Sequence, residues 1–147
     1  MKKLYLDVCT LCRPFDNQNL MRIRLETDAY FIILQSIQRK KYEMIVSPVQ
    51  FNEIESIEDI KEKIQVLELL NVYGSQPGFD LVSIRNRAEH LFTFNFGIAD
   101  AVHLAFAEQS SDYFITCDDK LIKRSRRTKL DLEVFNPVEF CMKEELK

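Results

Sequence analysis

Short apolar runs alternate along this chain with longer segments whose apolar residues recur at helical spacing. The short runs have the length and composition of buried strands, and they cover residues 3–8, 43–47, 111–116 and 131–135. Parallel strands need long crossover connections, which are usually helices, so strands separated by helices favour a parallel sheet. We therefore predict an α/β fold in which helices cover both faces of the sheet.

The segments between these runs predict helices and turns. Residues 19–40 have one long amphipathic pattern, and Pro48 suits the first turn of a helix that Ser47 could cap. Charge-rich helical sequence then continues to a turn at residues 74–80, and residues 81–84 are predicted to be extended. Further helices are expected at the remaining segments, which are residues 85–94, 95–109, 118–127 and 137–146.

Composition restricts the class of protein. The 147 residues suit a single domain, 1–147, and no uninterrupted apolar stretch of 18 residues is present. The apolar run at the N-terminus is cut by Asp7, which argues against a secretion signal, so we expect a cytoplasmic protein. A net charge of −3 argues against broad, charge-driven binding of nucleic acid. An enzyme whose acidic site recruits cations is still compatible with that charge.

Two common kinds of site have little support. The three glycines form no glycine-rich phosphate loop, which argues against nucleotide binding of that kind. Cys9 and Cys12 have the spacing of a zinc knuckle or a redox pair. No second Cys/His pair with suitable spacing accompanies them, so we expect ordinary reduced thiols.

Acidic residues follow two of the predicted strands. Asp7 ends the first run, and Asp118 and Asp119 follow the third. Each could cap the next helix or initiate a turn, because acids are favoured in both places. Each could equally bind a metal, because ligands of open α/β sheets collect at the carboxyl ends of the strands. From position alone, both interpretations of Asp7 stay open.

Two more acids lie in predicted helices. Asp100 and His103 are three residues apart in an otherwise apolar helix, so they could share a helix face and a metal. Asp100 could instead cap that helix, and His103 is better interpreted as a core or supporting residue. Glu53 belongs to the helix after the second strand, where spacing alone does not separate it from Glu55 and Glu58.

Carboxylates that converge without partners repel one another, and divalent cations relieve that repulsion. Hard cations such as Mg²⁺ and Mn²⁺ prefer oxygen ligands. They can lower the pKa of a bound water and stabilise a phosphodiester during hydrolysis. A cluster of these acids would thus allow an acidic protein to act on nucleic acid.

With these residues identified, the chain resembles the PIN-domain family of metal-dependent ribonucleases over nearly its entire length. "YLDVCTLCRPFD" is similar to the first-strand motif with its acid, and "VSPVQFNEIE" to the strand–Ser–helix segment. "GIADAVHLAFA" resembles the Asp-Ala-x-His-Leu-Ala helix and is the most specific match. "FITCDDKLIK" resembles the Thr-x-Asp segment. The resemblance selects four acids, Asp7, Glu53, Asp100 and Asp118, with Asp119 as an alternative to Asp118.

The resemblance implies a three-layer α/β/α fold with a central parallel sheet of four or five strands. It also implies that the four acids bind Mg²⁺ or Mn²⁺ and that the protein is an endoribonuclease. Many small members are toxins of toxin–antitoxin pairs and are often dimeric, so an antitoxin and a homodimer are expected partners, beside RNA. PIN-like proteins without activity also exist, and the alternative is a catalytically silent module that binds a protein or RNA.

Several residues could support such a site. Thr116 and Ser47 could donate hydrogen bonds to ligand carboxylates, and both could equally be helix caps. The basic segment at residues 120–129 could bind RNA phosphates or be an exposed helix end that suits the helix dipole. The candidate RNA-binding residues are Arg13, Lys123, Arg124, Arg126 and Arg127.

Two rival functions are considered. In a protein-binding module, Phe92, Phe94 and Phe96 could form an exposed apolar patch, although we expect them in the core or in a dimer contact. A phosphotransfer receiver domain also gathers acids at strand ends. It would need a phosphoacceptor Asp on its third strand and a Lys after its fifth, and residues 71–84 do not supply that pattern.

Overall fold

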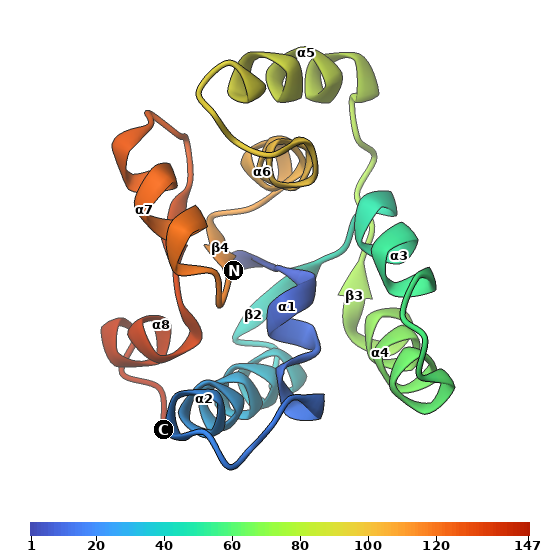
Figure 1. The fold of residues 1–147 in the computed structure, drawn as a ribbon, viewed down its shortest axis with the longest axis vertical. Coiled ribbons are helices and arrows are strands. Elements are labelled where there is room, and N and C mark those ends of the chain that lie inside the picture. Colours follow the sequence, from blue (N-terminus) through green and yellow to red (C-terminus); the bar gives the residue numbers. More distant parts are fainter.

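A computed structural model of the chain describes residues 1–147. It contains five strands, eight α-helices and one short 3₁₀ helix at Arg13–Phe15 (Figure 1). In chain order the other elements are β1 (Lys2–Leu6), α1 (Val8–Leu11), α2 (Met21–Gln38), β2 (Tyr42–Ile45), α3 (Pro48–Glu55), α4 (Ile60–Tyr73), β3 (Gly74–Ser75), α5 (Leu81–Phe92), α6 (Ile98–Ser110), β4 (Tyr113–Ile115), α7 (Asp119–Arg127), β5 (Glu133–Phe135) and α8 (Pro137–Lys143).

The five strands form one sheet in the order β3-β2-β1-β4-β5, and every pair is parallel. This arrangement confirms the predicted α/β fold with a central parallel sheet. From β1 the chain builds the sheet outward through β2 and β3, and it then returns to the other side of β1 for β4 and β5. The strand order therefore reverses between β1 and β4. In open α/β sheets, that reversal opens a crevice at the carboxyl ends of the strands.

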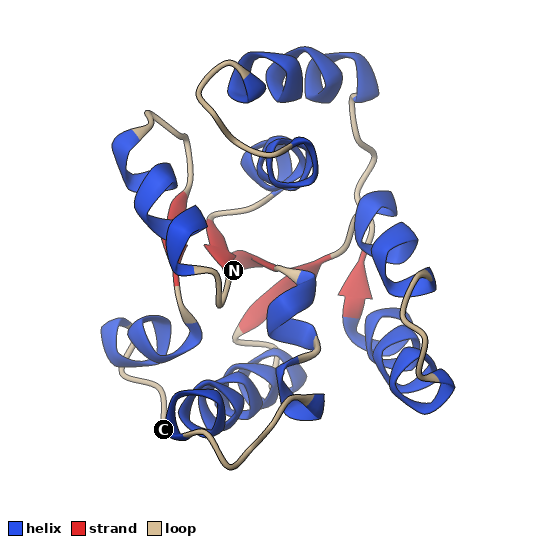
Figure 2. Cartoon of the chain, in the orientation of Figure 1, coloured by secondary structure: helices blue, strands red, loops and turns tan.

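Helices cover both faces of the sheet, as Figure 2 shows. In β1, Leu4 and Leu6 belong to one buried cluster, which includes residues of α2, α4 and α8. Tyr5, between them, belongs to the other cluster, which includes residues of α5, α6 and α7. Successive side chains of a strand point to opposite faces, so a strand buried on both sides has a nearly continuous apolar sequence.

Two local predictions were wrong. Residues 81–84, expected to be extended, form the first turn of α5, because the Asp80 carboxylate accepts a hydrogen bond from the Ser83 backbone and caps the helix. The predicted turn after α4 contains the short strand β3, which pairs with the end of β2. A side chain at Gly74 would place its Cβ 2.4 Å from the Leu70 carbonyl oxygen, so only glycine fits this close approach.

The helix predicted at residues 19–40 is slightly shorter and spans Met21–Gln38. None of the helices is both long and apolar enough to cross a membrane.

Candidate metal centre

Asp7 lies directly after β1, at the reversal of strand order. Its carboxylate accepts hydrogen bonds from the Val8 backbone N–H, at 2.9 Å, and from the Thr116 hydroxyl, at 2.8 Å. The bond from Val8 makes Asp7 the N-cap of α1, so the capping interpretation describes part of its role. Asp7 is buried, and burial raises the pKa of its carboxyl. A buried carboxylate in this position favours a bound cation.

Asp118 follows β4, the strand beside β1. One of its oxygens accepts hydrogen bonds from the Lys120 and Leu121 backbone N–H groups and thereby caps α7. The Asp118 backbone N–H donates to the Thr116 hydroxyl oxygen at 3.1 Å. Because the same hydroxyl donates to Asp7, Thr116 links the segments that carry the two strand-end acids.

The neighbouring acid, Asp119, has a different partner. Its two carboxylate oxygens accept hydrogen bonds from the two terminal nitrogens of Arg22, at 2.5 and 2.7 Å. This pair joins the first turn of α2 to the start of α7, and the hydrogen bonds to Arg22 lower the pKa of Asp119. The structure therefore gives Asp119 an ion pair of its own, whereas Asp118 forms none.

Asp100 lies in the first turn of α6. The helix begins at Ile98 with Gly97 as its cap residue, so the interpretation of Asp100 as the cap was wrong. The pKa of its half-buried carboxyl is raised by burial and then by the negative charges of Asp7 and Asp118, with a smaller contribution from Glu53. The other three acids therefore act electrostatically on Asp100 from their separate segments.

Glu53 reaches the same region from α3. Its carboxylate oxygen Oε1 lies 2.5 Å from Nε2 of His103, and His103 is buried in α6. The start of α3 is held against the sheet by Gln50, whose side-chain amide donates to the Leu6 carbonyl oxygen and accepts from the Ser47 backbone N–H. Gln50 thus fixes the helix one turn before Glu53.

The histidine also belongs to a chain of buried side chains. Its Nδ1 lies 2.7 Å from the Tyr5 hydroxyl, which lies 2.6 Å from the Ser47 hydroxyl. Ser47 is the N-cap residue of α3, as one of its two predicted roles requires, and its hydroxyl also contacts Tyr5. His103 is buried and contacts both Tyr5 and Glu53, and its supporting role stays a prediction.

The donor atoms suit a hard divalent cation. One ligand atom each of Asp7, Glu53 and His103 lie within 4.8 Å of one another. None of the nine ion pairs in the structure joins Asp7, Asp100 or Asp118 to a lysine or arginine. Two carboxylates of raised pKa, Asp7 and Asp100, have no basic partner and belong to an oxygen-rich site that fits a hard divalent cation.

The candidate RNA-binding cations have different environments. Arg13 donates to Glu26 and Asp16, so its charge is already paired. Arg126 pairs with Glu139 and donates to a backbone carbonyl of β5. The other three candidates, Lys123, Arg124 and Arg127, form no ion pair in the structure, and neither does Lys120 of the same helix.

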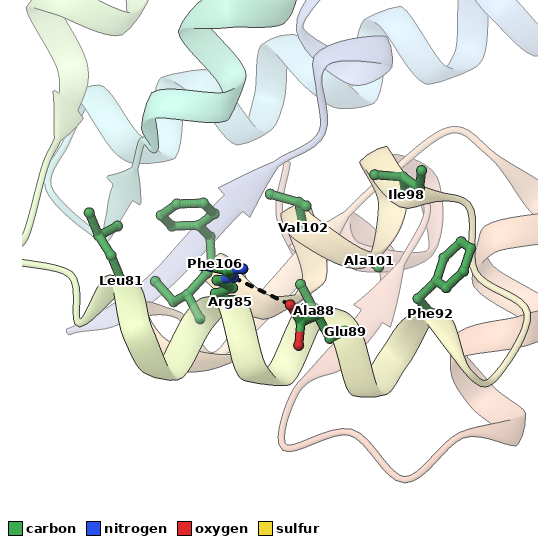
Figure 3. Close-up of a pocket in the computed structure, with 10 residues that line it drawn as sticks. Leu81, Arg85, Ala88, Glu89, Phe92, Ile98, Ala101, Val102 and Phe106 are labelled. Carbon is green, nitrogen blue, oxygen red and sulfur yellow. Dashed lines mark hydrogen bonds and ion pairs between the residues drawn. The ribbon is translucent and has the colours of Figure 1, made fainter.

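An apolar groove lies between α5 and α6 (Figure 3). Its volume is about 470 Å³, and Arg85 and Glu89 are its charged residues. Of the three phenylalanines singled out in the sequence, Phe96 is in the core, whereas Phe92 and Phe94 are about half exposed. The residues that line the groove are Leu81, Ile84, Arg85, Ala88, Glu89, Phe92, Ile98, Ala101, Val102 and Phe106.

Sequence reasoning missed Tyr5, Gln50 and Cys9. Tyr5 is the only side chain with a hydroxyl inside the first apolar strand, which was the available signal. Gln50 gave no signal, because a glutamine in the first turn of a helix is ordinary. The Cys9 thiol lies 3.4 Å from the Asp7 carboxylate and from the Thr116 hydroxyl, and all four cysteines are free.

Comparisons with known proteins identify the fold. No protein-family model matches the chain, and no curated protein matches its sequence significantly. A structure of FitAcB from Neisseria gonorrhoeae is similar, with a TM-score of 0.55 and 17% identity over 91% of this chain and 97% of the other. A structure of FitAB bound to IR36 DNA fragment has a TM-score of 0.56 and 19% identity, over 92% and 95% of the two chains. These likenesses, together with the parallel five-stranded sheet, show that the chain has the PIN-like fold that its motifs predicted.

Proposed function

We propose that this protein is a metal-dependent endoribonuclease that hydrolyses RNA phosphodiester bonds. The observation that carries the proposal is geometric: ligand atoms of Asp7, Glu53 and His103, from three separate segments, lie within 4.8 Å of one another at the reversal of strand order. Asp7, Asp100 and Asp118 have no basic partner, and burial raises the pKa of Asp7 and Asp100, so the negative charge of these two is unfavourable without a cation. A protein that needed these acids only as helix caps would have no reason to gather them in one place.

The four acids would have different roles in binding the cation. Asp7, Glu53 and Asp100 would hold the principal cation, and Asp118 would complete its site or hold a second, weaker one. A bound Mg²⁺ or Mn²⁺ supplies a water of lowered pKa and stabilises the negative charge of the phosphodiester during hydrolysis. Thr116 keeps the Asp7 carboxylate oriented, since its hydroxyl donates to one Asp7 oxygen.

Three cations of α7 would position the substrate. Lys123, Arg124 and Arg127 are free of ion pairs and belong to the helix that Asp118 caps. Cations of this kind contact phosphate and do not read bases. The overall negative charge of the chain makes this local cluster the best candidate for holding RNA beside the acids.

The experiment is a cleavage assay on a mixed RNA pool with purified protein. We expect cleavage with Mg²⁺ or Mn²⁺ and none with a chelator. Asp100→Asn should lower the rate by roughly 100-fold or more, because loss of a direct ligand exceeds the effect of an outer-shell residue, while circular dichroism shows the fold intact. Asp119→Asn is the matched control, because Asp119 pairs with Arg22. Full activity of Asp100→Asn would contradict the proposed four-acid metal site.

The resemblance to PIN-domain proteins also supports a role as the toxin of a toxin–antitoxin pair. The expected partner is a small antitoxin protein, and the test is co-purification with the product of an adjoining small gene expressed together with this chain. The toxin should arrest growth when expressed alone and should lose that effect with its antitoxin. Growth that is unaffected by this chain alone would contradict the toxin role.

A second candidate function is protein binding through the groove between α5 and α6, which is compatible with a catalytically silent module and with an active enzyme alike. Leu81, Phe92 and Ile98 line this groove and are each more than half exposed. A second copy would cover them in a two-fold dimer, and antiparallel α5 helices would place Arg85 opposite Glu89 of the other copy. Light scattering should give a dimer that Phe92→Asp converts to a monomer. A wild-type monomer would exclude this assembly.

A further inference from the structure

Four hydrogen-bonding side chains form a continuous series that ends at a candidate metal ligand. The Ser47 hydroxyl lies 2.6 Å from the Tyr5 hydroxyl, which lies 2.7 Å from Nδ1 of His103. Nε2 of the same ring lies 2.5 Å from Oε1 of Glu53. Tyr5 and Ser47 are 0% exposed and His103 is 2% exposed, so water does not compete for the interior bonds.

The direction of the last bond follows from its chemistry. An ionised carboxylate only accepts hydrogen bonds, so Nε2 of His103 must donate its proton to Glu53. The other ring nitrogen is occupied by the Tyr5 hydroxyl, which fixes the orientation of the ring. Tyr5 is itself immobilised in the central strand β1, where it stacks on Phe114 with ring centroids 5.5 Å apart.

This arrangement restricts a side chain that would otherwise be free. Glutamate has several rotatable bonds, and ordering it costs conformational entropy. Glu53 is partly exposed on α3, and its only ion pair is with His103. With Oε1 held by the ring, its second oxygen is available to a cation. Glu55, at the end of α3, and Glu58, in the connection to α4, have no hydrogen-bonded side-chain partner in the structure, which separates Glu53 from them.

We propose that Tyr5 and His103 are positioning residues that hold Glu53 in the geometry needed to bind the divalent cation. The inference rests on the proposed metal site and adds two residues that act through Glu53. Neither residue needs to touch the cation or the RNA. Ser47 completes the series by occupying the remaining side of the Tyr5 hydroxyl.

Two substitutions of His103 separate its two nitrogens. The glutamine amide nitrogen lies near the position of imidazole Nε2, so His103→Gln keeps a donor for Glu53. The asparagine amide matches the position of Nδ1, so His103→Asn keeps a partner for Tyr5 and loses the contact with Glu53. The dissociation constant of Mn²⁺ alone, measured by electron paramagnetic resonance of the free ion, reports the effect without any activity assay.

We expect His103→Asn to weaken Mn²⁺ binding by about 10- to 100-fold, the usual effect of losing an outer-shell partner. His103→Gln should stay closer to wild type, and Tyr5→Phe should weaken binding by a smaller factor because the ring loses one of its two anchors. Leu104→Ala is the matched control, since Leu104 is a fully buried neighbour of His103 in α6 and belongs to the core. It should unfold at a lower temperature with unchanged Mn²⁺ affinity.

The outcomes are distinct. Wild-type Mn²⁺ affinity in His103→Asn would overturn the positioning role and leave the metal site in place. Equal weakening in His103→Asn and Leu104→Ala would reduce the effect to general loss of stability and would also overturn it. If His103→Asn fails to fold, Tyr5→Phe provides the same test, because it keeps the volume of the strand residue. A wild-type protein that binds no Mn²⁺ would instead contradict the proposed function itself.

Discussion

Thr116 has the most connected polar side chain of the site. Its hydroxyl donates to Asp7, accepts from the Asp118 backbone and lies 3.4 Å from the Cys9 thiol. Thr116→Val keeps the shape of the residue but leaves both partners unpaired, so we expect a loss of about 1–3 kcal/mol of unfolding free energy. Thr116→Ser should retain most of it, because the hydroxyl remains. Denaturant titration of both variants is the measurement, and equal stability of Thr116→Val and wild type would contradict this role.

Asp100 should destabilise the metal-free protein at neutral pH. Its folded-state pKa is raised above the ordinary value of 3.8 by burial and by Asp7 and Asp118. The folded state then binds more protons than the unfolded state, so this residue's contribution to stability falls as pH rises above that value. In a chelator, Asp100→Asn should be more stable than wild type at pH 7, and the difference should shrink toward pH 4. Thermal unfolding across this range tests the sign.

At the scale of elements, α7 begins at the candidate metal site, because its cap residue, Asp118, follows strand β4. Asp118 caps this helix and is also the fourth candidate ligand, and the two roles can be separated. Asparagine caps helices about as well as aspartate, whereas alanine costs about 1 kcal/mol. Asp118→Asn should therefore keep wild-type stability and lose RNA cleavage, while Asp118→Ala should lose both. Chemical unfolding measures the stability of both variants, and the cleavage assay measures their activity. Full cleavage by Asp118→Asn would show that Asp118 acts only as a helix cap.

Most helices and strands were predictable from the sequence. The exceptions, β3 and the first turn of α5, depend on single contacts that an apolar pattern does not show. The strands β4 and β5 fall within predicted apolar runs of the sequence, and β1 and β2 each begin one residue before theirs. The two-residue strand β3 has no such run, because its pairing with β2 depends on the close approach of Gly74 to α4. The first turn of α5 has a strand-like apolar pattern, and a single cap at Asp80 decides it as helix.

For the whole molecule, we expect RNA binding to depend more on where the charges lie than on the net charge. The chain has a net charge of −3, yet four cations without an ion pair, Lys120, Lys123, Arg124 and Arg127, lie on the helix that Asp118 caps. Replacing Lys123 or Arg127 with alanine should weaken RNA binding similarly for every sequence and lower the slope of log affinity against log salt by about 1. Lys61→Ala, an exposed lysine of α4, is the control. RNA affinity is measured by fluorescence anisotropy in the Asp100→Asn background, so that cleavage does not interfere with binding. An unchanged salt slope would show that these cations do not contact RNA phosphates.

The sequence by itself determined the class of fold and the four candidate acids. Strand and helix periodicity is a local property, and the four acids were selected by the resemblance of their short motifs to those of PIN-domain proteins, since spacing alone did not separate Glu53 from Glu55 and Glu58. Only the tertiary structure decided which side chains meet. Asp118 and Asp119 are adjacent in sequence, and Arg22, 97 residues from Asp119, separates their roles. Tyr5 and His103 are 98 residues apart and are joined because β1 and α6 pack together. Contacts between distant residues depend on packing, which no local pattern encodes.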